Sequence, residues 1–134
     1  MKRDTILIFE DNSIDRAILV ELFQSEYKLD LLKNNLPSIA IVLLDNIMPV
    51  MDGFAVLEYL KEKNILTKIP FIMITGESSA EMERRGYEYG IISYVKKPYQ
   101  PEVVKQVVQN AIGWFKYKMQ LELMVKKQTL IREA

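Results

Sequence analysis

The stretch Ile39-Ala40-Ile41-Val42-Leu43-Leu44-Asp45 decides the class of fold. A short continuous apolar run that stops at a carboxylate is typical of a strand buried on both faces, as in a parallel sheet. Three further short apolar runs, at residues 5–9, 70–74 and 91–95, stop at a polar or charged residue, namely Glu10, Thr75 and Lys96. The sequence therefore predicts a sheet of parallel strands that each end at polar residues.

Segments with helical periodicity separate these runs. Helices are predicted at 13–25, 54–63 and 79–89, and a last helix begins near Pro101, whose ring suits the first turn. Ser13 is the expected cap of the first helix, and Gly90 closes the third. Because strands alternate with helices, the predicted class is a doubly wound α/β domain.

The composition excludes several classes of function. The chain has 134 residues with 18 basic and 18 acidic side chains, so a general polyanion-binding surface is not expected. Cysteine and histidine are both absent, which excludes thiolate chemistry, serine–histidine hydrolysis and histidine-ligated metals. No apolar run approaches the ~18 residues of a membrane span. Carboxylates, lysines, arginines, hydroxyls and the backbone remain for chemistry.

The polar residues at the strand ends predict that chemistry. In open parallel sheets ligands bind beyond the carboxyl ends of the strands, which here carry Glu10-Asp11, Asp45, Thr75 and Lys97. Three carboxylates at one edge repel one another, and Mg²⁺ relieves such repulsion. A lysine and a hydroxyl suit phosphoryl oxygens, and a carboxylate can accept a phosphoryl group covalently. The prediction is an aspartyl-phosphate site.

These residues, with Met51-Asp52-Gly53, Tyr94 and Pro98, resemble the receiver domain of bacterial two-component response regulators. The separations of 30 residues from Asp45 to Thr75 and 22 from Thr75 to Lys97 suit that family. The resemblance covers about residues 2–113 and implies a flavodoxin-like fold with strand order 2-1-3-4-5.

The resemblance assigns an acceptor and a metal site. It makes Asp45 the phosphoacceptor and implies a bound Mg²⁺. The implied ligands are Asp11, Asp45 and the backbone carbonyl of Ile47, with Glu10 acting mainly through a metal-bound water. Asp52 is expected to be a turn or cap residue and not a ligand.

The resemblance also assigns the residues that respond to phosphorylation. Lys97 pairs with the phosphoryl oxygens, and a cis peptide bond before Pro98 aims it into the site. Thr75 moves to hydrogen-bond to the phosphoryl group, and Tyr94 rotates inward behind it. Lys96 is expected to be a solvated neighbour of the functional lysine.

The implied function is phosphorelay signalling. A sensor histidine kinase, a phosphotransfer protein or a small phosphodonor supplies the phosphoryl group. Phosphorylation then switches the face formed by the helix at 79–89, the strand at 91–95 and the last helix. The protein is expected to be a cytoplasmic phosphoacceptor with limited self-phosphorylation and self-dephosphorylation, not a metabolic enzyme. No nucleic-acid or membrane partner is expected for this segment.

Two rival functions have weaker support. A haloacid-type phosphatase also forms an aspartyl phosphate, but it needs a second aspartate two residues after the nucleophile, where this chain has Ile47. A dimerisation scaffold that is never phosphorylated would not need the complete set of acidic, hydroxyl and lysine residues.

One stretch departs from the family pattern. Only 34 residues separate Asp11 from Asp45, fewer than the family usually has. Residues 27–35 resemble the family's second helix, which leaves no room for its second strand. Either the protein lacks this strand or the sequence lacks residues that would form it, and we favour the second. Loss of the strand would expose residues 5–9 as an apolar edge prone to association.

The C-terminal segment extends beyond a minimal receiver. We expect a receiver domain at 1–113 and a helical linker at 114–134 that continues the last helix, as in longer response regulators with an output domain. A heptad stripe predicts a parallel coiled-coil homodimer, and the alternative is a helix that folds back on the domain. The stripe comprises Val103, Val107, Asn110, Trp114, Tyr117, Leu121, Met124, Gln128 and Ile131.

Overall fold

The computed structural model describes residues 4–10, 12–24, 28–30, 39–45, 53–76 and 79–133, with side chains described outside 28–30 and 128–133. Along the chain the elements are β1 (Thr5–Phe9), α1 (Ser13–Phe23), β2 (Lys28–Asp30), β3 (Ile39–Leu44), α2 (Gly53–Glu62), β4 (Phe71–Thr75), α3 (Ala80–Tyr89), β5 (Ser93–Lys96) and α4 (Pro101–Glu133). Within these ranges no helix is both long and apolar enough to cross a membrane.

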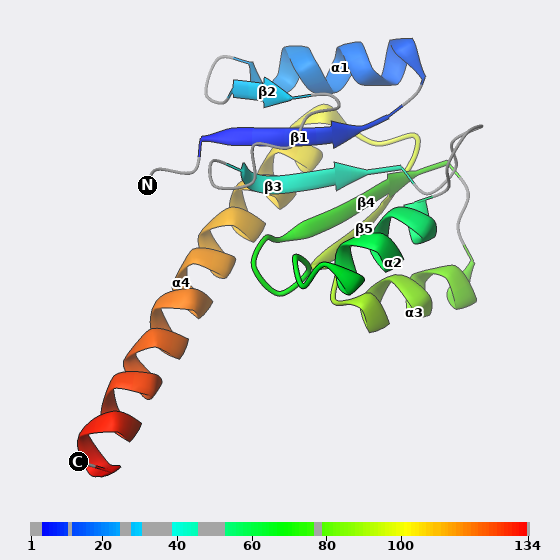
Figure 1. The fold of residues 1–134 in the computed structure, drawn as a ribbon. Helices are drawn as coiled ribbons and strands as arrows, with labels where there is room; N and C mark the ends of the chain where they lie inside the picture. Colours follow the sequence, from blue (N-terminus) through cyan, green and yellow to red (C-terminus); the bar gives the residue numbers. More distant parts are fainter. Residues whose placement is uncertain are drawn as a thin grey trace.

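The strands form one sheet in the order β2-β1-β3-β4-β5, and every neighbouring pair is parallel (Figure 1). This confirms the predicted doubly wound fold and its strand order. β3 and β4 are buried along their whole length, as expected for central strands with helices on both faces.

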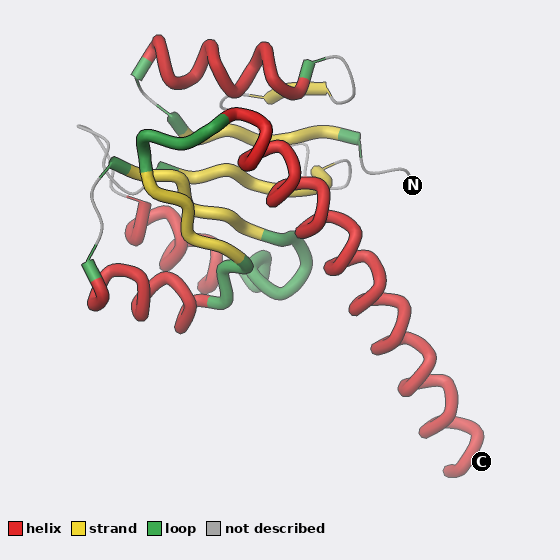
Figure 2. Tube along the Cα trace, turned by 180° about the vertical axis from the view of Figure 1, so that it is seen from behind, coloured by secondary structure: helices red, strands yellow, loops and turns green. Residues whose placement is uncertain are grey.

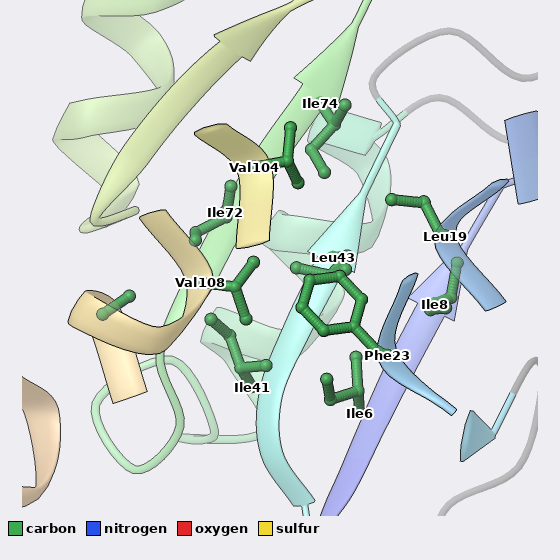
Figure 3. Packing of buried hydrophobic residues seen from close by; sticks show 11 residues of the cluster. Ile6, Ile8, Leu19, Phe23, Ile41, Leu43, Ile72, Ile74, Val104 and Val108 are labelled. Carbon is green, nitrogen blue, oxygen red and sulfur yellow. The ribbon is translucent and has the colours of Figure 1, made fainter. Parts of the chain in front are cut away.

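Two apolar clusters hold the helices on opposite faces of the sheet. α1 and α4 pack on one face, where Phe23 and Val108 meet the side chains of β1, β3 and β4 (Figure 3). α2 and α3 cover the other face, where Leu57 lies fully buried against Met73 and its neighbours. Burial of each such side chain contributes roughly 1.5–3 kcal/mol, so both helical layers fix the sheet from which the site is built.

The second strand is short but present. β2 pairs with β1 in the register Thr5↔Lys28, Ile6↔Leu29 and Leu7↔Asp30. The helix predicted at 27–35 is therefore wrong at 28–30, and the other residues of that prediction lie outside the described ranges. Three residues are too few for periodicity to separate strand from helix, so pairing with β1 decides the conformation. This pairing also covers the part of the β1 edge that was expected to be exposed.

Of the two predicted helix caps, the one at the start of α1 is wrong and the one at the end of α3 is confirmed. Asn12, not Ser13, caps α1, and its side chain accepts hydrogen bonds from the backbone N–H groups of Ile14 and Asp15 at 3.0 Å each. Ser79 caps α3 by accepting from the N–H of Met82, and Gly90 ends this helix with φ of 95°, in the left-handed region.

The last helix continues far beyond the domain (Figures 1 and 2). Val104, Val108 and Ala111 are buried against the sheet, and Phe115 is buried as well. The described side chains from 116 to 127 are all exposed. Gly113 does not interrupt the helix. The fold-back alternative is therefore wrong for this segment.

Candidate functional site

The predicted site residues lie at the carboxyl edge of the sheet. Glu10 follows β1, Asp45 follows β3, Thr75 ends β4 and Lys97 follows β5. Backbone hydrogen bonds extend the sheet to this edge, since the N–H of Asp45 donates to the carbonyl of Phe9 (2.9 Å) and that of Lys97 to the carbonyl of Thr75 (2.8 Å). Residues from four strands are thereby brought to one place.

The ammonium group of Lys97 is the centre of this arrangement. Its Nζ donates to Oε1 of Glu10 at 2.5 Å and to Oδ2 of Asp45 at 3.3 Å. It donates also to Oδ2 of Asp15, at 2.7 Å. Asp15 lies in the first turn of α1 and was not among the predicted site residues. Acidic residues commonly occupy first turns because they complement the helix dipole, so an aspartate at this position was no separate signal of a role at the site.

These groups differ strongly in their access to water. The exposed fraction of the side chain is 2% for Glu10, 7% for Asp45 and 16% for Lys97, but 31% for Asp15. Glu10 and Asp45 are therefore buried carboxylates that depend on the cation, while Asp15 remains partly hydrated.

The electrostatics reflect this burial. Burial raises the pKa of Glu10 to about 7, and the neighbouring Asp45 raises it as well, against the opposing hydrogen bond from Lys97. Burial alone would lower the pKa of Lys97, but hydrogen bonds to Asp15 and Glu10 and the charge of Asp45 raise it above its usual value. The lysine therefore stays charged, and one ammonium group neutralises part of the acidic cluster.

The predicted metal ligands are only partly within the described residues. Asp11 and Ile47 lie outside them, as does Asp52. Among the described residues no group of three acidic side chains is arranged to hold a metal ion. Glu10 and Asp45 are nevertheless brought to the same cation, and paired buried carboxylate oxygens are the donors that Mg²⁺ prefers. The residues present therefore fit such an ion in their chemistry.

The two predicted switch residues share one face of the sheet. Tyr94 is in register with Met73, and side chains alternate along β4, so Met73 and Thr75 point to the same side as Tyr94. Thr75 is fully buried, and Tyr94 is half-buried against the cluster beneath α2 and α3.

The last two predicted features concern the residues beside Lys97. The peptide bond between Lys97 and Pro98 is cis. Lys96 is largely exposed, and its Nζ lies 3.4 Å from Oε1 of Glu83 on α3. The two adjacent lysines therefore point to different environments, one at the acidic cluster and one at the surface.

Comparison with known proteins identifies the family. The sequence model of the response regulator receiver domain matches residues 6–109. The "Probable transcriptional regulator ycf29" of Porphyra purpurea is 28% identical over 120 residues, which cover 84% of this chain and 57% of that protein. The corresponding protein of Pyropia yezoensis is covered over 54% of its length, so this chain spans about half of these curated relatives.

Solved structures agree with the topology. The chemotaxis protein CheY4 of Vibrio cholerae superposes with a TM-score of 0.70 at 22% identity, covering 81% of this chain and 98% of that one. The receiver domain of the sensor histidine kinase PA1611 of Pseudomonas aeruginosa, described with a magnesium ion in its active site cleft, gives 0.68 at 21%, covering 82% and 98%. These likenesses show the fold, and the match of the family model over most of the sequence shows the family. The chain belongs to the response regulator receiver domain family.

Proposed function

We propose that this receiver domain accepts a phosphoryl group on Asp45. The observation that carries the proposal is the ammonium group of Lys97, which joins the buried carboxylates of Glu10 and Asp45 at the end of three strands. A carboxylate at this position is shielded from bulk water but has a cation within reach of any group attached to it. The haloacid-type phosphatase rival has no comparable support, because the chain belongs to a family of signalling phosphoacceptors.

The chemistry follows from these side chains. A carboxylate oxygen of Asp45 attacks the phosphorus of a phosphohistidine on a sensor kinase or phosphotransfer protein. The P–N bond breaks, and its electron pair stays on the imidazole nitrogen of the donor. Lys97 balances the charge on the transferring oxygens. When Mg²⁺ is bound, it supplies further positive charge. Asp11, Asp45 and the carbonyl of Ile47 would hold it, with Glu10 acting mainly through a metal-bound water.

The output face is proposed to be formed by α3, β5 and α4. Thr75 ends the strand next to β5 and shares a sheet face with Tyr94. A new hydrogen bond from the Thr75 hydroxyl to a phosphoryl oxygen would draw this hydroxyl towards Asp45 and open space for the Tyr94 ring. A coupling on the order of 1–3 kcal/mol is typical of such linked sites.

The extended part of α4 is proposed to join two copies of the chain. Trp114, Tyr117, Leu121 and Met124 are 43–61% exposed on the segment that leaves the domain, and a shallow groove runs between Trp114, Leu121 and Val125. A contiguous apolar stripe of this kind needs a partner. A second α4 in a parallel coiled coil matches its heptad spacing and would hold two receivers side by side. Residues 114–134 would then be the linker to an output domain.

Intact-mass measurement with acetyl phosphate and Mg²⁺ tests the phosphoacceptor. The wild-type chain should gain one phosphoryl group, and peptide mapping should locate it at Asp45. The Asp45→Asn variant should gain none, whereas Glu21→Gln, an exposed change elsewhere on the domain, should label normally. Labelling of Asp45→Asn at the wild-type rate would refute the assignment, and an unlabelled wild type would favour the scaffold alternative.

A further inference from the structure

We propose that Asp15 is a positioning residue that competes with the phosphoryl group for Lys97. The proposal rests on Asp45 being the phosphoacceptor. Its basis is the 2.7 Å contact between Oδ2 of Asp15 and Nζ of Lys97, which lies beside the contacts of the same ammonium with Glu10 and Asp45.

The number of donors on the lysine makes this contact consequential. An ammonium group has three N–H donors and accepts no hydrogen bond. Lys97 has one carboxylate contact for each donor, to Glu10, Asp15 and Asp45. A phosphoryl oxygen can therefore gain a direct contact with Lys97 only if one of these three carboxylates gives its contact up.

Burial decides which contact is released. Asp45 would itself carry the phosphoryl group, so its 3.3 Å contact with Lys97 passes to that group, and any further phosphoryl contact must replace Glu10 or Asp15. The side chain of Glu10 is 2% exposed, so loss of the ammonium would leave its carboxylate without water to replace it. Asp15 is 31% exposed and can be rehydrated at much lower cost. Asp15 is thus the exchangeable partner, and it holds one donor of Lys97 until a phosphoryl group takes its place.

The local structure of α1 keeps Asp15 at this position. The Asn12 side chain accepts hydrogen bonds from the N–H groups of Ile14 and Asp15, which fixes the first turn. Nη1 of Arg16, the next residue, donates to the carbonyl of Glu10 at 3.1 Å and ties this turn to the end of β1. The carboxylate is therefore presented to Lys97 from a restrained helix end.

Competition between Asp15 and the phosphoryl group predicts in which direction the affinity for a phosphoryl mimic changes when Asp15 is replaced. Asp15→Asn should free the lysine and strengthen binding of a phosphoryl mimic, while a residue that only orients Lys97 would weaken it when removed. Because Asp15 is partly exposed, the expected gain is about three- to fivefold. Asp15→Glu keeps the carboxylate and should restore an affinity close to that of the wild type.

The experiment is a titration of the full chain with beryllofluoride and Mg²⁺, followed by amide NMR signals. Glu21→Gln, which removes the same charge from the exposed surface of α1, should bind as the wild type does and controls for net charge. A gain for Asp15→Asn that Asp15→Glu reverses supports the proposal. Unchanged or weaker binding by Asp15→Asn overturns it, and so does an equal gain in Glu21→Gln.

A second measurement tests the contact without any ligand. Urea unfolding of Asp15→Asn, Lys97→Gln and the double variant forms a double-mutant cycle. Non-additive changes in the free energy of unfolding are expected, and additive ones would overturn the proposal. If the wild type bound beryllofluoride but Asp15→Asn did not differ from it, only this inference would fail. If neither the wild type nor any variant bound it, the phosphoacceptor assignment would fail too and take this inference with it.

Discussion

Replacing Lys97 by methionine should destabilise the metal-free protein far more than the same change at the adjacent Lys96. Methionine keeps much of the side-chain volume but removes the charge. At Lys97 the change would leave Glu10 and Asp45 buried without their shared cation. At Lys96 it would remove only an exposed ion pair with Glu83.

The expected magnitudes follow from burial. Removing one partner of a buried ion pair typically costs about 3–5 kcal/mol, because the other charge is left uncompensated. Glu10 can escape part of this cost by binding a proton, so we expect a loss of about 2–4 kcal/mol near pH 8 for Lys97→Met. Exposed pairs contribute about 0–1 kcal/mol, which is the range expected for Lys96→Met.

The loss should also depend on pH, with a definite sign. The pKa of Glu10 in the folded protein is raised from 4.5 to about 7, so the folded state binds this proton more tightly than the unfolded state. The contribution of Glu10 to the free energy of unfolding is therefore full below pH 4.5 and is lost as the pH rises through about 7. Without the hydrogen bond from Lys97 the pKa rises further, so the deficit of Lys97→Met should grow between pH 5 and 8.

Urea unfolding with EDTA at several pH values, followed by circular dichroism, measures these quantities. Added Mg²⁺ should recover stability in Lys97→Met, since a ligand at about 100 times its Kd contributes about 2.7 kcal/mol. Lys97 is not the shared cation of Glu10 and Asp45 if Lys97→Met loses no more stability than Lys96→Met, or if its deficit is the same at pH 5 and pH 8.

Three further outcomes are expected. Gly90→Ala should lower the free energy of unfolding by about 1 kcal/mol, because a φ of 95° is strained for alanine. Gly113→Ala in the interior of α4 should raise the free energy of unfolding by about 0.5–1 kcal/mol, because glycine is less favourable than alanine within a helix. Thermal unfolding of the two variants separates the two signs. Thr75→Ala should bind beryllofluoride but shift the β5 amide signals less than the wild type does, and an undiminished shift would remove Thr75 from the switch. The double variant Leu121→Glu/Met124→Glu should be monomeric in sedimentation velocity and should still be phosphorylated. Added salt should strengthen the wild-type dimer, because basic residues predominate from 116 to 134 and repel one another. A wild type that stays monomeric at high micromolar concentration would refute the coiled coil.

The central strands could be predicted because their signal is local. β1 and β3 have the bounds of the apolar runs that predicted them, and β4 differs by one residue at each end. The edge strand β5 begins two residues later and ends one residue later than its run. Strands buried on both faces must be apolar throughout, so a single segment carries the information. The strand order then places their polar ends together, and for this reason Glu10, Asp45 and Lys97 could be expected at one site.

The features that were missed depend on partners distant in sequence or on competition between neighbours. β2 has three residues and owes its conformation to pairing with β1. Asn12 and Ser13 are both good caps, and only the hydrogen bonds from Ile14 and Asp15 decide between them. The capping choice matters at the site, because it sets where the first turn of α1 begins and hence where the side chain of Asp15 lies.

The first turn of α1 connects the residues that were missed, Asn12 and Asp15, to the proposed mechanism. A cap at Ser13 would begin α1 one residue later, about 100° further round the helix axis, and would release the hydrogen bonds that Asn12 accepts from the N–H groups of Ile14 and Asp15. The Asp15 carboxylate would then no longer be presented to Lys97 in the same way, although every predicted site residue would be unchanged. Which groups hold the three N–H donors of Lys97 thus depends on α1 as well as on the edge of the sheet. Two receivers with the same acceptor, hydroxyl and lysine can therefore differ in how readily the lysine is released to a phosphoryl group, and in this chain Asp15 is the residue through which that difference would arise.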